Sequence, residues 1–288
     1  MIIALDVMGG DFAPKNEVLG AIEFIKDEPN HELILVGDQA LILKYLNGFS
    51  SNRLHVQHAD QVVTMKDVPS VAIREKKESS MAIGLNLHKS NEAQAFVSCG
   101  NTGAQMAFSG LILKRISGVN RAAIGAFMPH PEGFTYIMDI GANADCKPIN
   151  LVQFAIMSDI MVRHMYQKPS PKIGLLSIGE EDSKGNELTI EVNSILRQNK
   201  TLNFSGNIEG RDILTGEFDI IICDGFTGNI ILKMAESFMG VISKGLKIGI
   251  GKNPFRMLGA VLMKPAFANL KRMYNYETHG GVPLLGLN

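Results

Sequence analysis

The sequence predicts an α/β protein built on an open, mostly parallel sheet flanked by helices, an α/β/α sandwich. Short apolar runs without polar–apolar alternation indicate strands that are buried on both faces. Stretches with helical spacing separate these runs, and strands that alternate with helices are typical of parallel sheets with right-handed crossovers. Five of the apolar runs lead directly into a small turn, rich in Gly, Asn and Asp, that opens a helix.

Each predicted strand is an apolar run that ends at a turn. The five runs with their turns lie at 2–11, 95–104, 136–143, 174–181 and 220–229. Two further strands are predicted at 33–36, which ends at Gly37 and Asp38, and at 54–56. A last short strand is expected near the end of the sequence, in the Leu-Leu-Gly-Leu-Asn run at 284–288.

The intervening helices are predicted from spacing and from proline. Helical spacing and length mark 151–165 and 187–196. Pro14 and Pro148 suit the first turns of two helices, where the missing N–H of proline removes no helical hydrogen bond. The sequence shows no long linker and no low-complexity segment, so a domain boundary cannot be identified. We therefore expect a single α/β catalytic unit over residues 1–288.

Composition excludes several classes of protein. Among 288 residues, 28 Lys and Arg nearly balance 29 Asp and Glu, and there is no Trp, which argues against a nucleic-acid partner. Three cysteines, Cys99, Cys146 and Cys223, lack metal-site spacing and leave an odd thiol, which favours a reducing cytoplasm. The N-terminus enters a strand at once, so no signal peptide is expected, and no apolar run reaches the ~18–20 residues of a membrane span.

One segment differs from the rest, because residues 237–276 contain no acidic residue. Apolar side chains alternate there with basic ones, and Asn253 and Pro254 resemble the N-cap and first residue of a helix. We expect a protruding helical hairpin, formed by two short helices, that lies on an anionic membrane or docks against partner helices. A hairpin packed in the core with a solvated basic face is an alternative. The side chains expected to face a membrane or a carrier protein are Lys252, Arg256, Leu258, Leu262 and Lys264.

The five glycine-rich turns predict an anionic site. The carboxyl ends of parallel strands meet at one edge of a sheet, where such proteins bind ligands. Glycine allows backbone N–H groups to approach a ligand closely, and helix N-termini favour anions, so phosphate is the expected ligand. The candidate side chains and glycines on these turns are Asp6, Gly9, Gly10, Asn101, Thr102, Gly103, Asp139, Asn143, Lys184, Asp224 and Asn229.

Each candidate has a structural alternative. Asn101 or Thr102 could simply cap a helix, and Asp139 and Asn143 could form an ordinary turn. Lys184 lies in the run Glu-Glu-Asp-Ser-Lys-Gly-Asn, which suits a point charge beside phosphate but equally a solvated charge cluster. Asn229 could steady an oxyanion or cap a helix. The basic stretch at 65–81 could bind an acidic ligand or form a plain surface helix.

Several catalytic motifs are absent. The sequence contains no G-x-x-x-x-G-K-[ST] loop, no G-x-S-x-G elbow and no H-E-x-x-H motif. No G-x-G-x-x-G follows the first strand. An acyl transfer in which phosphate itself attacks would need none of these motifs and no protein nucleophile.

Taken together, the turns resemble a known family. The matching blocks are IALDVMGGD at 3–11, SCGNTGA at 98–104, DIGAN at 139–143, LSIGEE to KGN at 176–186, CDGFTGN at 223–229 and GGVPLLG at 280–286. In order and spacing they resemble the acyl-carrier-protein:phosphate acyltransferases of bacterial phospholipid synthesis over essentially the whole chain. That family has a fold similar to isocitrate and isopropylmalate dehydrogenases and to phosphotransacetylases. Its members usually continue past the last block with a Gly/His/Ser-rich turn and a helix.

The resemblance implies that acyl-ACP and inorganic phosphate give acyl phosphate and free acyl carrier protein. It implies that Lys184 neutralises charge and that Asn229 orients the carbonyl or phosphate. Loop residues 101–103 would cradle phosphate, while Asp6, Asp139 and Asn143 would shape the pocket. No cofactor and no metal are implied.

The expected partners are an acyl carrier protein, a second copy of the chain in a homodimer, an anionic membrane surface and a downstream membrane acyltransferase. The protein would be cytoplasmic and peripherally attached to the inner face of the membrane. One rival function is a metal-dependent NAD(P) decarboxylating dehydrogenase of the same fold, with Asp6, Asp139 and Asp224 around Mg²⁺. Another rival is a non-catalytic membrane-surface adaptor that uses the predicted hairpin.

Overall fold

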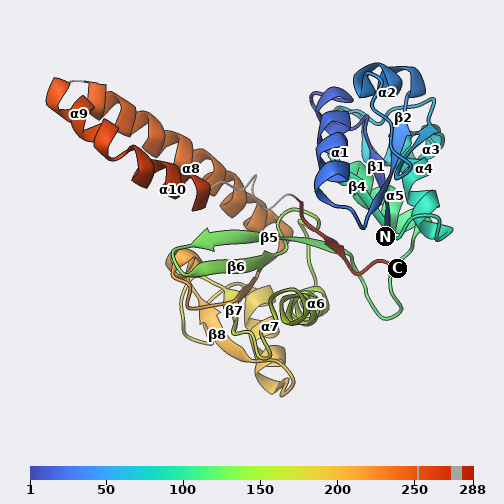
Figure 1. Ribbon diagram of the computed structural model, residues 1–288. Coiled ribbons are helices and arrows are strands. Elements are labelled where there is room, and N and C mark those ends of the chain that lie inside the picture. The colour runs from blue at the N-terminus through green and yellow to red at the C-terminus, as the bar shows by residue number, and fades with distance from the viewer. Residues whose placement is uncertain (252, 274–280) are drawn as a thin grey trace. The chain divides into compact units, whose positions relative to one another are not determined.

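The computed structural model describes residues 1–251, 253–273 and 281–288 (Figure 1). Contacts divide the chain into two compact units, unit 1 with Met1–Ile116 and Leu287–Asn288, and unit 2 with Ser117–Gly286. The sequence showed no boundary here, because the connection at 116–118 is short and has no linker composition. Both units carry candidate site residues, so a single catalytic unit over the whole chain remains a prediction.

Unit 1 is a parallel sheet covered by helices on both faces. Its four strands lie in the order β3-β2-β1-β4, with every pair parallel. The strands are β1 (Ile2–Asp6), β2 (Glu32–Gly37), β3 (Leu54–His58) and β4 (Ala95–Ser98). The helices are α1 (Lys15–Asp27), α2 (Gln39–Leu46), α3 (Pro69–Glu75), α4 (Ser80–Lys89) and α5 (Thr102–Ile112).

Alternate residues of β2 show why its sequence is continuously apolar. Leu33 and Leu35 pack into one cluster with the buried residues of α1 and α2. Ile34 and Val36 pack into another cluster, which includes Ile83 of α4. Both faces of the strand are therefore buried, as the lack of alternation in the sequence predicted.

Unit 2 is a mixed sheet of six strands in the order β10-β5-β6-β9-β7-β8. The neighbouring strands β6, β9, β7 and β8 are parallel to one another. The strand β5 runs antiparallel to β6, and β10 runs antiparallel to β5. The strands are β5 (Ala123–His130), β6 (Gly133–Met138), β7 (Ile173–Leu176), β8 (Phe204–Ile208), β9 (Ile220–Ile222) and β10 (Leu284–Leu285). The prediction of a mostly parallel α/β sheet is confirmed, although β5 and β8 were not predicted.

Helices also cover both faces of the sheet in unit 2. The helices α6 (Pro148–Tyr166) and α7 (Glu187–Gln198) pack on one face, in a cluster with Tyr136 and Met138 of β6. The neighbouring Ile137 points to the other face, toward the start of α8 (Gly225–Gly251) and the 3-10 helix η1 (Gly210–Leu214). Pro148 occupies the first turn of α6, as predicted.

The predicted helical hairpin is present, but its first helix is much longer than expected. The helix α8 has 27 residues and runs out from the sheet of unit 2, and α9 (Pro254–Leu262) and α10 (Lys264–Met273) fold back beside it (Figure 1). Asn253 caps α9 by accepting the N–H of Phe255 at 2.8 Å, and Pro254 follows in the first turn, as predicted. Lys252 and residues 274–276 of the predicted hairpin lie outside the described residues. None of the helices in the described part of the chain has the length and hydropathy of a membrane span.

Candidate functional site

In unit 1, the ends of β1 and β4 are tied together by the buried carboxylate of Asp6. Its oxygens accept the N–H of Met8 at 3.0 Å and the hydroxyl of Ser98 at 2.8 Å. The same hydroxyl oxygen accepts the N–H of Gly100 at 3.1 Å. Asp6 therefore shapes the two loops, and Ser98, which sequence reasoning missed, is the link between them.

Close backbone approach explains the glycines of the first loop. A β-carbon on Gly9 would lie 2.7 Å from the Cα of Gly100, and one on Gly10 would lie 1.9 Å from Oε1 of Glu17. A larger residue at Gly9 would push the two loops apart, whereas one at Gly10 would displace the end of the Glu17 side chain. A direct contact of Gly9 or Gly10 with phosphate stays a prediction.

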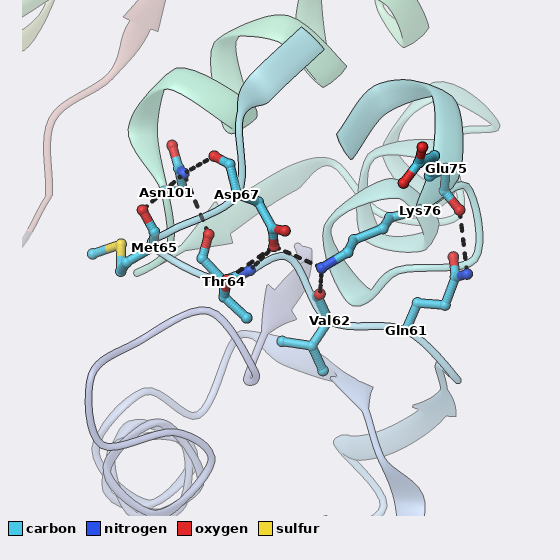
Figure 2. Close-up of polar contacts among 8 residues, drawn as sticks. All are labelled: Gln61, Val62, Thr64, Met65, Asp67, Glu75, Lys76 and Asn101. Carbon is cyan, nitrogen blue, oxygen red and sulfur yellow. Dashed lines mark hydrogen bonds and ion pairs between the residues drawn. The ribbon is translucent and has the colours of Figure 1, made fainter. Parts of the chain in front are cut away.

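The side-chain amide of Asn101 forms hydrogen bonds through both its oxygen and its nitrogen, and Figure 2 shows those of the nitrogen. Its oxygen accepts the N–H of Ala104 at 3.0 Å, which makes Asn101 the N-cap of α5. Its nitrogen donates to the carbonyls of Thr64, Met65 and Asp67 at 3.3, 3.4 and 3.0 Å. The helix-cap alternative is thus realised, and Asn101 also holds the loop at 64–67 beside the first turn of α5. In that turn, Thr102 and Gly103 are exposed.

The same loop is locked by an ion pair. Figure 2 shows Lys76 reaching across to Asp67, with 2.6 Å between Nζ and Oδ2, while Nζ also donates to the Val62 carbonyl at 2.8 Å. The N–H and hydroxyl of Thr64 donate to the same carboxylate at 2.6 and 2.9 Å. These hydrogen bonds, chiefly that from Lys76, lower the pKa of Asp67. Lys76 therefore stabilises the loop at 64–67, although it lies in the basic stretch at 65–81 that was considered a possible site for an acidic ligand.

In unit 2, Asp139 and Asn143 form the turn that follows β6. The buried Asp139 carboxylate accepts the N–H groups of Gly141, Ala142 and Asn143 at 3.2, 3.0 and 2.7 Å. The side-chain amide of Asn143 donates to this carboxylate and to the Ala122 carbonyl, both at 2.8 Å. Burial raises the pKa of Asp139 and these hydrogen bonds oppose it. Both side chains thus shape the turn, and a role in binding substrate stays a prediction.

The first turn of α8 packs directly on that loop. The N–H of Gly225 donates to the Asn143 carbonyl at 2.8 Å, and a β-carbon on Gly225 would lie 2.7 Å from the same oxygen. Asp224 caps the helix, since its carboxylate accepts the N–H and hydroxyl of Thr227 at 2.8 and 3.0 Å. The glycines of the DGFTGN motif therefore permit close packing of loop and helix. Asn229 is exposed, and its side chain lies against Gly141.

The loop that carries Lys184 follows β7 and is pinned by two arginines. Glu180 pairs with Arg211 at 2.9 Å, and Asp182 pairs with Arg197 at 2.6 Å. Lys184 itself is exposed and forms no ion pair among the described residues. Two of the three acids beside Lys184 are thus neutralised by other cations, so its ammonium is available to an anion. The sequence could not reveal this, because both arginines lie outside the motif.

A pocket of about 630 Å³ opens at this edge of unit 2. Its walls are formed by the loops that follow the adjacent parallel strands β6, β9 and β7. One lining residue, Asn186, is two residues after Lys184 in the sequence. Burial raises the pKa of the Cys146 thiol in its wall to about 11. Sequence reasoning missed Cys146 as a wall residue. The lining residues are Ala144, Asp145, Cys146, Asn186, Leu188, Asp224, Phe226 and Thr227.

The predicted site residues therefore form two sets. Asp6, Gly9 and Gly10 lie beside 101–103 in unit 1, because β1 and β4 are neighbours. In unit 2, Asp139, Asn143, Lys184 and Asp224 lie on loops that follow adjacent strands, and Asn229 lies in the first turns of α8, which follows one of those loops. Within the described ranges, no three His, Cys, Asp or Glu side chains are grouped to hold a metal ion. Of the residues predicted to face a membrane or carrier protein, Arg256, Leu258, Leu262 and Lys264 are exposed on the hairpin, and Lys252 lies outside the described residues.

Known proteins resemble the whole chain. A family model described as "Fatty acid synthesis protein" matches residues 1–288. Phosphate acyltransferase from Geobacter sulfurreducens is 44% identical over 290 residues, which cover 100% of this chain and 83% of the relative. Phosphate acyltransferase from Thermoanaerobacterium thermosaccharolyticum is 44% identical over 287 residues, with 100% and 85% covered.

Solved structures support the fold. A phosphotransacetylase from Streptococcus pyogenes superimposes with a TM-score of 0.61 at 19% identity, covering 83% of this chain and 82% of the other. The EutD phosphotransacetylase from Staphylococcus aureus gives a TM-score of 0.61 at 17% identity, with the same coverage. With a family model and relatives at 44% identity that span its full length, the chain belongs to the fatty acid synthesis protein family.

Proposed function

We propose that this chain is a phosphate acyltransferase that moves a fatty acyl group from an acyl-acyl carrier protein to inorganic phosphate. The observation that carries the proposal is the full-length similarity to phosphate acyltransferases at 44% identity. The acyl phosphate formed is an activated acyl donor, suited to phospholipid synthesis.

In this reaction, an oxygen of bound phosphate attacks the thioester carbonyl and a tetrahedral oxyanion forms. The C–S bond then breaks, the carbonyl re-forms as acyl phosphate, and the carrier leaves as its thiolate. The rate would depend on positioning of the two substrates and on stabilisation of the oxyanion. The unpaired ammonium of Lys184 supports a role in neutralising charge, and the exposed amide of Asn229 supports a role in orienting the carbonyl or phosphate.

The cysteines favour direct attack by phosphate over an acylated enzyme. Burial raises the pKa of the Cys146 and Cys223 thiols. Partial desolvation beside the carboxylates of Glu17 and Asp6 raises the pKa of the more exposed Cys99. A nucleophilic cysteine needs a lowered pKa, because the thiolate is the reactive form. The thiol that lines the pocket of unit 2 is thus kept neutral at physiological pH.

The test is product formation by the purified protein. Incubation with acyl-acyl carrier protein and phosphate should give free carrier thiol and acyl phosphate, trapped as its hydroxamate, in equal amounts, and omission of phosphate should abolish both. Formation of NAD(P)H from a hydroxy acid and a divalent metal, without acyl phosphate, would instead support the dehydrogenase. Absence of any turnover would leave the adaptor function.

The hairpin supports two partners, a second copy of the chain and an anionic membrane. Along α8, Met234, Phe238, Val241 and Ile248 are exposed at spacings of four, three and seven residues, the pattern of a helix-pairing seam. At the tip, Phe255, Leu258 and Leu262 are 84%, 62% and 76% exposed. In the proposed homodimer, the α8 seams pair and the apolar tips with Arg256 and Lys264 face the inner membrane surface. The acid-free surface also suits an acidic acyl carrier protein, and membrane attachment would deliver acyl phosphate to a membrane acyltransferase.

A further inference from the structure

Two buried amides lie beneath the loop that carries Lys184. Asn207 on β8 and Asn193 on α7 are only 6% and 2% exposed. Nδ2 of Asn193 donates to Oδ1 of Asn207 at 2.8 Å. The amide nitrogen of Asn207 consequently faces the loop, where it donates to the carbonyl of Glu181 at 2.9 Å and to that of Lys184 at 3.4 Å.

The backbone at Lys184 is held from other sides as well. The hydroxyl of Ser177 donates to the Lys184 carbonyl at 3.0 Å, and the N–H of Lys184 donates to the Glu181 carbonyl at 2.9 Å. Gly185 follows with a φ of +122°, a conformation that only glycine adopts without strain. The position of the Lys184 backbone is therefore fixed, while its side chain stays exposed.

The amide pair is buried, which makes its hydrogen bonds decisive. A buried amide is unfavourable unless its polar atoms are paired. An aliphatic residue could fill the same space, but it could not donate hydrogen bonds. The particular contribution of Asn207 is therefore the two hydrogen bonds that its amide nitrogen donates to the loop.

We propose that Asn207, oriented by Asn193, is a positioning residue that sets Lys184 for the transfer of an acyl group to phosphate. This inference rests on the proposed function. Asn207 touches no substrate in this scheme and acts through the backbone of Lys184. The Glu180–Arg211 ion pair holds the loop just before this segment, so loss of Asn207 loosens mainly the backbone from Glu181 to Lys184.

The test is the variant Asn207→Asp, which keeps the size of the side chain but turns an oxygen toward two carbonyls. We expect kcat/KM for acyl phosphate formation to fall by roughly 10–100-fold, because small misplacements of a catalytic group are costly. The matched control is Asn203→Asp. The Asn203 amide donates to the Ser170 carbonyl at 3.1 Å, but it is exposed and makes no hydrogen bond to the Lys184 loop. Its activity should stay within about twofold of wild type, the scale of most surface substitutions.

A double-mutant cycle separates positioning from general stability. In a Lys184→Ala background, followed under single-turnover conditions with excess enzyme, Asn207→Asp should cause less than about a twofold further loss, because the two changes remove the same interaction. An equal loss in both backgrounds, or no loss in otherwise wild-type protein, overturns the proposal. Wild-type protein is assayed first, so a chain that makes no acyl phosphate contradicts the proposed function itself.

A milder variant covers the case in which Asn207→Asp does not fold. Ser177→Ala removes only the other side-chain donor to the Lys184 carbonyl. In a protein with an unchanged thermal midpoint, it should lower turnover several-fold with Lys184 present and leave the Lys184→Ala rate unchanged. A loss of the same size in both backgrounds argues against positioning through Lys184.

Discussion

A β-carbon on Gly228 would lie 1.9 Å from the carbonyl oxygen of Asp139. The first turn of α8 thus packs on the loop after β6 so closely that only a hydrogen atom fits. This contact places Asn229, the next residue, against that loop. The glycine of the motif is required for packing between two backbones, since its φ is not positive.

Gly228→Ala should therefore destabilise the protein. Overpacking typically costs about 1–3 kcal/mol, and a clash with backbone lies at the upper end because neither partner can rotate away. The control is Gly240→Ala in the same helix, where a β-carbon would meet no atom within 4 Å. That change should stabilise by about 0.5–1 kcal/mol, the gain of alanine over glycine inside a helix. Denaturant unfolding of both variants checks this, and equal midpoints would contradict the close packing.

Lys184→Ala should nearly abolish acyl phosphate formation in a folded protein. Loss of one electrostatic contact to developing charge commonly lowers the rate by about 10²–10³. Release of carrier thiol in steady state is the measurement. Lys200→Ala, which changes another exposed lysine of unit 2, is the control and should behave as wild type. A Lys184→Ala rate within about twofold of wild type, the range of most surface changes, removes Lys184 from the mechanism.

Asn229→Ala should lower kcat more than it raises the KM for phosphate. An amide aimed at the oxyanion acts mainly in the transition state, so its loss appears in turnover. Steady-state kinetics with varied phosphate measure both constants. An unchanged kcat with a raised KM would reassign Asn229 to binding of the ground state.

The Asp67–Lys76 pair predicts a pH-dependent contribution to stability. The pKa of Asp67 is lowered in the folded protein, chiefly by Lys76, so its contribution is present above the unfolded pKa of about 3.9 and is lost as pH falls through the folded pKa. Asp67→Asn should lower the thermal midpoint at pH 7 by roughly 2–4 °C, the shift for a loss of about 1 kcal/mol. The difference from wild type should vanish in acid, below the folded pKa.

The control for this pair is Asp60→Asn. The side chain of Asp60 is 80% exposed and pairs with His58 on the surface, so its loss should be small at every pH. A thermal midpoint of Asp67→Asn that differs from wild type by the same amount at pH 3 and pH 7 would show that charge is not the cause.

The fold could be predicted because continuous apolar runs and glycine-rich turns are properties of short segments. The strand β5 was missed because Gly125 and Pro129 interrupt its pattern. Gly125 is needed there because a β-carbon would lie 2.3 Å from the ring of Tyr136, a fact of packing between strands. The strand β8 was missed for a similar reason, because the polar residue Asn207 interrupts its apolar pattern. Its amide is buried only because the loop at 181–184 supplies hydrogen-bond acceptors, which the local sequence does not show.

The sequence predicted which loops form the candidate site, but it did not predict the role of each side chain on them. Asn101 has the same atoms whether it caps a helix or binds phosphate, so spacing could not choose between them. Lys76 and Lys184 both lie among acidic residues in the sequence. In the structure Lys76 forms an ion pair with Asp67. The acids Asp182 and Glu180 near Lys184 instead pair with Arg197 and Arg211, so they do not pair with Lys184. Those partners lie 9 to 31 residues away along the chain, beyond the reach of a local motif.

Replacing Leu258 and Leu262 with Glu should release the protein from anionic vesicles while activity on soluble acyl-acyl carrier protein persists. Both side chains are exposed on α9, and burying each in the lipid interface would contribute about 1.5–3 kcal/mol. The added charges would also be repelled by anionic lipid. The control is Leu111→Glu, a 61% exposed leucine of α5 in unit 1, which should leave binding unchanged. Flotation with anionic vesicles at low salt measures binding, and wild-type protein that fails to float would leave the hairpin as an element for dimerisation alone.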